Sequence, residues 1–149
     1  MTVPYDVFTE AFLSKVTEYN FCRLSERNRQ ALVDGYMKRA CAQFASVCKY
    51  DIMNGDDDAR CFDFKDASEW EVTEIADIVS EGMLVQWMKP YTYKHENLEN
   101  MLNTSDFSTY SPAELLRRIL DAYNMCKRDF VNMTREYSYR HGDLTDLHL

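Results

Sequence analysis

The sequence predicts an all-α fold, an antiparallel helical bundle of three long helices and one or two short ones. Apolar residues recur at intervals of three and four over long stretches, which is the spacing of one helix face. The 149 residues include only four glycines and three prolines, too few for the many tight turns of a β-sandwich or barrel. An apolar content of 46% is enough for the core of one domain.

Two helices are predicted in the first third of the chain. The first runs from about Pro4 to Tyr19, and Pro4 is tolerated in its first turn. The second runs from the N-cap Ser25 to Cys48. Gly35 interrupts the apolar pattern of this second helix, and we expect it to pack closely against a neighbouring helix. The apolar positions of the two helices are Tyr5, Phe8, Phe12 and Val16, then Leu32, Val33, Tyr36, Met37, Ala40, Cys41, Phe44, Val47 and Cys48.

The segment from Lys49 to Lys65 breaks the helical period and is predicted to be an acidic loop. Asn54-Gly55 is a turn signal, and the acidic run Asp56, Asp57 and Asp58 follows it. Cys61-Phe62-Asp63-Phe64 alternates in polarity, which is typical of a short extended piece. We expect Phe62 and Phe64 to hold the loop against the core.

The third helix is predicted to begin at Asp66, with Glu69 completing a capping box, and to end at Lys89-Pro90. Its apolar side comprises Trp70, Ile75, Ile78, Val79, Met83 and Trp87. A short amphipathic helix is predicted over about His95 to Asn103.

The last helix has the clearest start in the sequence. Ser111 stands at the N-cap, Pro112 at the first helical position and Glu114 at the third. The apolar period runs to about Tyr137, with Leu115, Leu116, Ile119, Leu120, Tyr123, Cys126, Phe130 and Met133 facing inward. We therefore divide the chain into a helical bundle domain, residues 1–138, and an extended C-terminal arm, residues 139–149.

The sequence contains no motif typical of catalysis or cofactor binding. The sequence has no glycine-rich phosphate loop, and its three histidines are not at zinc-site spacing. With Gly55 at position six of an EF-hand loop, Tyr50 and Cys61 would take positions one and twelve, which require carboxylates. We expect no cofactor, no metal and no enzymatic activity. A cysteine–histidine pair formed from distant parts of the chain stays open as an alternative.

The N-terminus lacks the basic and apolar regions of a secretory signal, and no stretch reaches the roughly 18 apolar residues that span a bilayer. The five cysteines form no C-x-x-C pair, which favours reduced thiols in a protein made in the cytoplasm. Three of them, Cys41, Cys48 and Cys126, are expected to be small buried hydrophobic residues.

The net charge of −8 is unevenly distributed along the chain. Residues 51–81 contain eleven acidic residues against Arg60 and Lys65, which gives this segment −9 and the rest of the chain about +1. An acidic protein is a poor general nucleic-acid binder. An acidic edge can instead meet the basic edge of a neighbouring copy, although a simple solvated surface is the alternative. The candidate subunit-interface residues are Arg27, Arg39, Arg117, Arg118 and Trp87.

Several segments together carry a family resemblance. They are Tyr5-Asp6-Val7-Phe8 with Ala11-Phe12-Leu13, Leu32 to Ala40 with Phe44, Glu74-Ile75 through Trp87-Met88-Lys89-Pro90, the Ser111-Pro112 helix, and the aromatic-basic Tyr137-Ser138-Tyr139-Arg140. As a pattern over most of the chain, this arrangement resembles the small head–tail connector proteins, also called neck or adaptor proteins, of tailed bacteriophages.

The resemblance implies a structural virion protein of the phage neck, made in the host cytoplasm. Its partners would be further copies in a ring, typically twelve-fold, then the portal protein and the next neck or tail-completion protein. DNA would be passing cargo, and no membrane is involved. The residues implied in portal docking by the arm are Tyr137, Tyr139, Arg140 and Leu144. The loop residues Asp56, Asp57 and Asp58 would face the DNA lumen, where like charge repels DNA, or a subunit edge.

Two other classes of protein share a helical bundle and stay open. A non-viral α-helical interaction module would have the same fold without a ring partner. A small terminase subunit would also form a ring, but it needs a basic helix-turn-helix, which the acidic composition disfavours.

Overall fold

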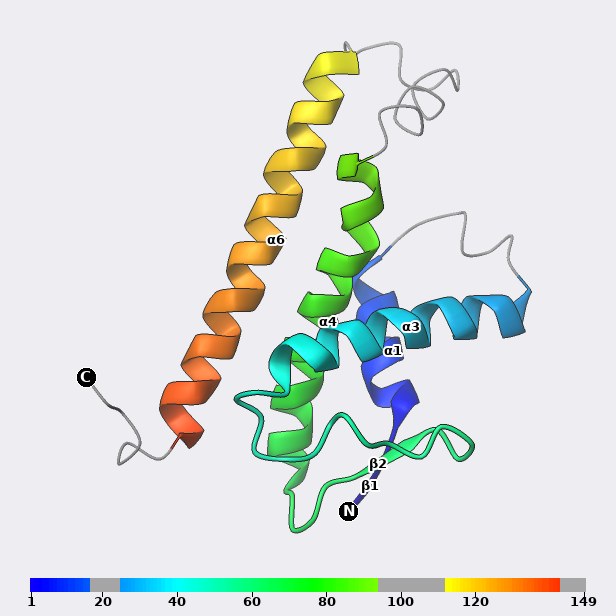
Figure 1. Ribbon diagram of the computed structural model, residues 1–149, viewed down its shortest axis with the longest axis vertical. Coiled ribbons are helices and arrows are strands. Elements are labelled where there is room, and N and C mark those ends of the chain that lie inside the picture. Colours follow the sequence, from blue (N-terminus) through cyan, green and yellow to red (C-terminus); the bar gives the residue numbers. More distant parts are fainter. Residues whose placement is uncertain (17–24, 94–111, 143–149) are drawn as a thin grey trace.

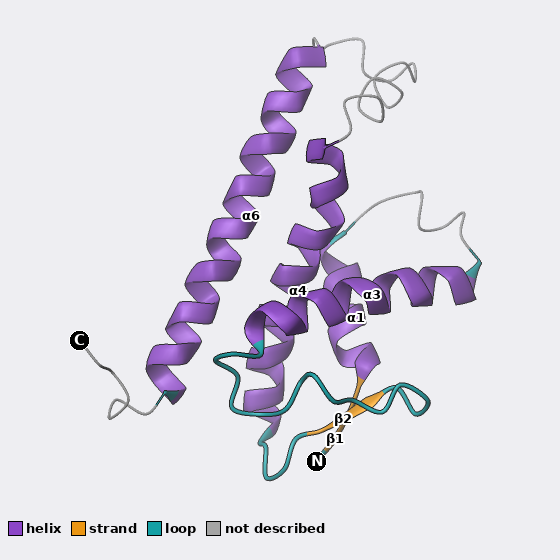
Figure 2. Cartoon of the chain, viewed as in Figure 1, coloured by secondary structure: helices purple, strands orange, loops and turns teal. Residues whose placement is uncertain are grey.

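The computed structural model describes residues 1–16, 25–93 and 112–142, and these residues confirm the all-α class (Figure 2). Its elements in chain order are β1 (Thr2–Pro4), α1 (Tyr5–Lys15), α3 (Glu26–Phe44), β2 (Cys61–Asp63), α4 (Glu69–Tyr93) and α6 (Pro112–His141). The helix predicted over 95–103 and the predicted cap Ser111 lie outside the described residues.

The two longest helices, α4 and α6, form an antiparallel pair (Figure 1). Helix α3 lies across α4, and α1 packs against both α4 and α3. The strands β1 and β2 pair antiparallel, with Val3 opposite Phe62, and so join the N-terminus to the loop that precedes α4. The short extended piece predicted at Cys61 to Phe64 is therefore confirmed over Cys61–Asp63.

The starts of α1 and α3 agree with the sequence, whereas the end of α3 does not. Pro4 has an extended conformation and directly precedes α1. The Ser25 side chain accepts a hydrogen bond from the Asn28 backbone N–H at 3.3 Å, as expected of an N-cap. Helix α3 ends at Phe44 rather than Cys48. The Phe44 carbonyl accepts hydrogen bonds from both Val47 and Cys48, which closes the chain into a turn.

Both predicted ends of α4 are wrong. The capping box is formed by Ser68 and Glu71, each accepting a hydrogen bond from the other's backbone N–H, at 3.2 and 3.1 Å. Asp66 has a φ of 59°, which is not a helical conformation. At the other end, Pro90 lies in the last turn and the helix continues to Tyr93. A proline so close to the end removes only one backbone hydrogen bond.

Helix α6 begins at Pro112, as predicted, but it extends to His141. The prediction that residues from 139 onward leave the helix as an extended arm is therefore wrong for 139–141. Tyr137 and His141 continue the inward face that contains Phe130, and their rings lie 4.3 Å apart. Packing against the rest of the domain thus extends the helix past the last strongly apolar residue.

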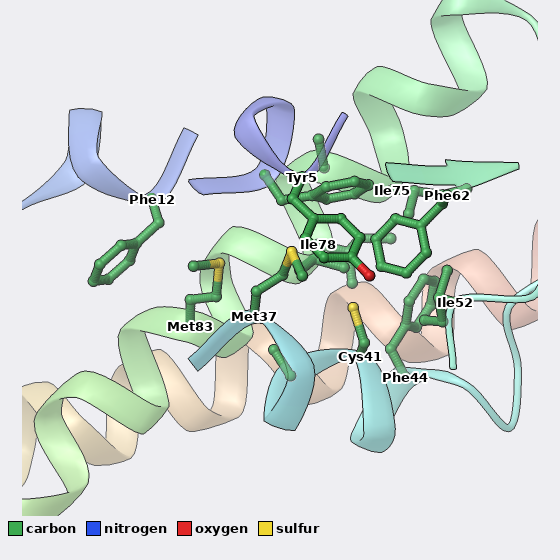
Figure 3. Packing of buried hydrophobic residues seen from close by; sticks show 14 of the residues in the cluster. Tyr5, Phe12, Met37, Cys41, Phe44, Ile52, Phe62, Ile75, Ile78 and Met83 are labelled. Atoms are coloured by element: carbon green, nitrogen blue, oxygen red, sulfur yellow. The ribbon is translucent and has the colours of Figure 1, made fainter. Parts of the chain in front are cut away.

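The core lies where α1, α3, α4 and the loop converge (Figure 3). Its fully buried side chains include Phe8, Phe12, Met37, Phe44, Phe64, Ile75, Ile78 and Met83. Phe62 and Phe64 are 3% and 0% exposed, which confirms that they hold the loop against the core. Trp70, predicted on the apolar side of its helix, is 70% exposed, so that prediction is wrong.

The close helix packing predicted at Gly35 occurs at Gly82 instead. A Cβ atom on Gly35 would meet nothing within 4 Å. A Cβ atom on Gly82 would lie 2.8 Å from the Phe130 ring and 2.9 Å from the Ala40 Cβ. Gly82 therefore marks a point where α4 lies close to both α3 and α6.

Candidate functional site

The predicted acidic residues of the loop have different roles. Asp56 Oδ1 accepts hydrogen bonds from the backbone N–H groups of Asp58 and Ala59, at 3.0 and 3.1 Å, which fixes a local turn. Asp57 accepts a 2.8 Å hydrogen bond from the Tyr5 hydroxyl and forms a 3.0 Å ion pair with Lys38. The hydrogen bond from Tyr5 is the main cause that holds the pKa of Asp57 below its usual value. Of these three acidic residues, only Asp58 has an exposed side chain with no hydrogen bond or ion pair within the described residues.

Arg60 fastens the same loop to two helices. Its guanidinium donates to both carboxylate oxygens of Asp34, at 3.0 and 2.8 Å, and to Asp6 at 2.8 Å. The hydrogen bonds to Asp34 are the main cause that raises the pKa of Arg60 above its usual value. The Arg60 backbone has a φ of 52°, and its carbonyl accepts a hydrogen bond from the Tyr5 N–H. Asp56, Asp57 and Arg60 together make this a fixed loop.

Several acids outside the loop are also paired within the chain. Lys15 forms ion pairs with Asp77 and Glu81, at 3.2 and 2.9 Å. Lys49 lies 3.3 Å from Glu71. The acidic segment 51–81 is thus partly neutralised by basic residues from elsewhere in the same molecule.

The residues predicted for portal docking lie at the end of α6. Tyr137 is 1% exposed, packs edge-on against Phe44 at 4.9 Å and accepts a 3.1 Å hydrogen bond from the Lys49 N–H. Burial raises the pKa of Tyr137 to about 12. Tyr137 is therefore a core residue, and its assignment to the docking arm is wrong. Tyr139 is 66% exposed and open to a partner, while Leu144 lies outside the described residues.

The fourth predicted docking residue, Arg140, is bound to α4. Arg140 Nη2 lies 2.6 Å from Glu74 Oε1, and His141 Nε2 lies 3.1 Å from Glu74 Oε2. The Glu74 side chain is only 8% exposed, so the Arg140 guanidinium compensates its charge and His141 contacts its other oxygen. Arg140 thus anchors the end of α6 to α4.

The predicted subunit-interface residues are distributed over three helices. Arg27 and Arg39 of α3 and Arg117 of α6 are exposed, and none forms an ion pair within residues 1–16, 25–93 and 112–142. Arg118 is exposed as well. Trp87 is partly buried against the core, and its ring lies 6.0 Å from the Tyr91 ring. Arg27, Arg39 and Arg117 are therefore available to a partner, whereas Trp87 belongs in part to the core.

Three of the five cysteines, Cys41, Cys48 and Cys126, offer little for nucleophilic chemistry. Burial raises the pKa of the Cys41 thiol to about 12 and also raises the pKa values of Cys48 and Cys126. The reactive thiolate is strongly disfavoured at these three positions. In the part of the chain that the structure describes, no group of three or more His, Cys, Asp or Glu side chains could hold a metal ion. No described helix is both long and apolar enough to cross a bilayer.

Comparisons of the chain with models of known protein families, with curated proteins and with solved structures found no significant match. The residues themselves therefore carry the functional argument.

Proposed function

We propose that this chain is a structural virion protein, a head–tail connector of a tailed bacteriophage. Copies of the chain form a ring that docks on the portal and continues the DNA channel toward the tail. The family resemblance of the sequence and the all-α fold support this proposal. The protein acts by assembly and not by catalysis.

The observation that carries the proposal is the distribution of charges left after pairing within the chain. Arg27, Arg39 and Arg117 are exposed on α3 and α6 without an acidic partner in the described part of the molecule. Asp58 of the loop and Glu69 at the start of α4 are exposed, and neither forms an ion pair within the described residues. Exposed charges of opposite sign that stay unpaired within one copy favour head-to-tail contact between copies.

The proposed ring gives each surface a role. Tyr139, exposed at the end of α6, contacts the portal. The exposed arginines form the basic edge of each subunit interface, and the acidic loop around Asp58 faces the neighbouring copy. DNA passes through the ring as cargo, and the tail-side surface receives the next neck or tail-completion protein.

Mass photometry of the purified chain, alone and mixed with the portal protein encoded in the same genome, tests this function. We expect ring-sized assemblies when the portal is present, visible as a collar by electron microscopy. The substitution Arg117→Glu should reduce ring formation. Arg135→Glu changes the net charge equally at another exposed position of α6 and serves as the control. A chain that neither oligomerises nor binds the portal is not a connector.

A further inference from the structure

A groove of about 300 Å³ lies where α6 passes α4 and the C-terminal end of α3. Val85 of α4 and Phe130 and Val131 of α6 provide its apolar wall. This volume is at the lower end of the range of about 300–1,000 Å³ found for ligand pockets. The groove has room for two or three side chains of a bound segment.

Three polar side chains of this groove, Gln86, Lys89 and Lys127, have no hydrogen-bond or ion-pair partner within the described residues. Gln86 is 6% exposed, and its side-chain amide makes no hydrogen bond within the described residues. The amide atoms are not sealed off within the fold, so they are available to a group that enters the groove. Lys89 and Lys127 also line the groove, and neither forms an ion pair in the described ranges. By contrast, Lys15, Lys38 and Lys49 are all paired.

We propose that the groove binds the C-terminal segment, residues 143–149, of a second copy of the chain. This segment reads Asp-Leu-Thr-Asp-Leu-His-Leu and so alternates carboxylates with leucines. The carboxylates of Asp143 and Asp146 complement Lys89 and Lys127. The leucines cover the apolar wall, and the segment's backbone supplies hydrogen-bond partners for Gln86.

The length of the chain favours a second copy over the segment's own chain. A helix rises 1.5 Å per residue, so Lys127 lies about 22 Å from Gly142 along α6. The four residues 143–146 span at most about 13 Å when fully extended. Asp146 of the same chain therefore reaches only the near edge of the groove, at the level of Thr134, and stops about two turns short of Lys127. The same chain can thus cover that edge but cannot place its carboxylates against the lysines. The segment of a neighbouring copy has no such restriction.

This inference rests on the proposed ring, in which residues 143–149 of each copy would connect it to the next copy. A contact between the end of one copy and a groove on the side of the next is heterologous, and its repetition closes a ring when the rotation permits. Leu144 then contacts the neighbouring copy, and Tyr139 stays the portal-docking residue.

Fluorescence anisotropy tests the proposal with a labelled, C-terminally amidated peptide of residues 139–149 titrated with the chain lacking residues 143–149. We expect Lys127→Glu to weaken peptide binding about tenfold or more, because it places like charges together. The control Arg135→Glu changes the net charge of α6 equally outside the groove and should leave binding unchanged. A peptide with Asp146→Lys should bind the Lys127→Glu chain better than the unchanged peptide does.

The results separate this inference from the proposed function. Equal peptide binding by the unchanged and Lys127→Glu chains overturns the groove assignment. The assignment to a second copy is also overturned if the full chain stays monomeric at every concentration and its own residues 143–149 cover the groove. A chain whose copies associate through the groove but never bind a portal overturns the connector function alone. Unfolding curves of each variant establish that a loss of binding is not a loss of fold.

Discussion

At the scale of single residues, Glu71 connects the loop to the start of α4. Its carboxylate accepts hydrogen bonds from the Tyr50 hydroxyl at 2.7 Å and the Ser68 N–H at 3.1 Å, and it lies 3.3 Å from the Lys49 ammonium. The hydrogen bond from Tyr50 is the largest cause that lowers the pKa of Glu71 from 4.5 to about 2. One side chain thus caps a helix and fixes the preceding loop.

The low pKa of Glu71 predicts how stability depends on pH. A carboxylate with a lowered pKa contributes stability fully above its unfolded value of 4.5 and loses it as the pH falls toward about 2. Glu71→Gln keeps one oxygen that can accept from both Tyr50 and Ser68, as Oε2 does, but has no charge. Urea unfolding of both proteins across this range should show a stability difference at neutral pH that closes between pH 4.5 and 2. A difference independent of pH would contradict the assigned role of the charge.

Arg60 shows why some residue roles could not be predicted from the sequence. It stands out there only as one of two basic residues among eleven acids. Its partners Asp34 and Asp6 lie 26 and 54 positions away, and apolar periodicity contains no information about such polar pairs. The three-way contact needs the folded arrangement of the loop, α1 and α3.

At the scale of the elements, periodicity located every described long helix, while local chemistry decided where each one ends. The cap Ser25 and the proline Pro112 mark starts that the sequence predicted correctly. The capping pair Ser68 and Glu71 was present in the sequence, but the overlapping pair Asp66 and Glu69 has the same spacing. The extension of α6 to His141 depends on Glu74 of another helix, so no local pattern reveals it.

Replacing Gly82 or Gly35 by alanine should change the free energy of unfolding in opposite directions. Gly82→Ala places a methyl group 2.8 Å from the Phe130 ring and 2.9 Å from the Ala40 Cβ. Separating the helices should lower the free energy of unfolding by about 1–3 kcal/mol. Gly35→Ala adds its methyl group in open space and should raise that free energy by about 0.5–1 kcal/mol.

Thermal or urea unfolding measures both variants under identical conditions. Gly35→Ala is the matched control, because it makes the same chemical change inside another helix. If Gly82→Ala were also stabilising, α4 would not approach α3 and α6 as closely as the structure places it.

At the scale of the whole molecule, the acidic segment is a part of the fold and not a separate charged face. Basic residues from α1, α3, the loop and α6 reach residues 51–81 through Lys15, Lys38, Lys49 and Arg140. The sequence predicted where the acids lie along the chain. It could not predict how many would be paired, because each partner comes from a distant segment.

The same pairing predicts where the chain can be shortened. Removal of residues 143–149 leaves every described helix contact in place, so the free energy of unfolding should stay unchanged. Removal of residues 139–149 also deletes Arg140 and His141 and leaves the buried carboxylate of Glu74 without compensation. Breaking a fully buried ion pair costs about 3–5 kcal/mol. The Arg140 side chain is half-exposed, so we expect the loss of stability to be smaller than that but measurable.

Urea unfolding of the two shortened chains beside the full chain measures this difference. A third protein separates the charge effect from a simple loss of helix length. Glu74→Gln in the chain ending at residue 138 removes the uncompensated charge, so it should restore part of the lost stability. Equal stability of both shortened chains would mean that the end of α6 is not held by Glu74. Because assembly needs residues 143–149 in our proposal, the chain ending at residue 142 should fold fully and yet fail to form rings.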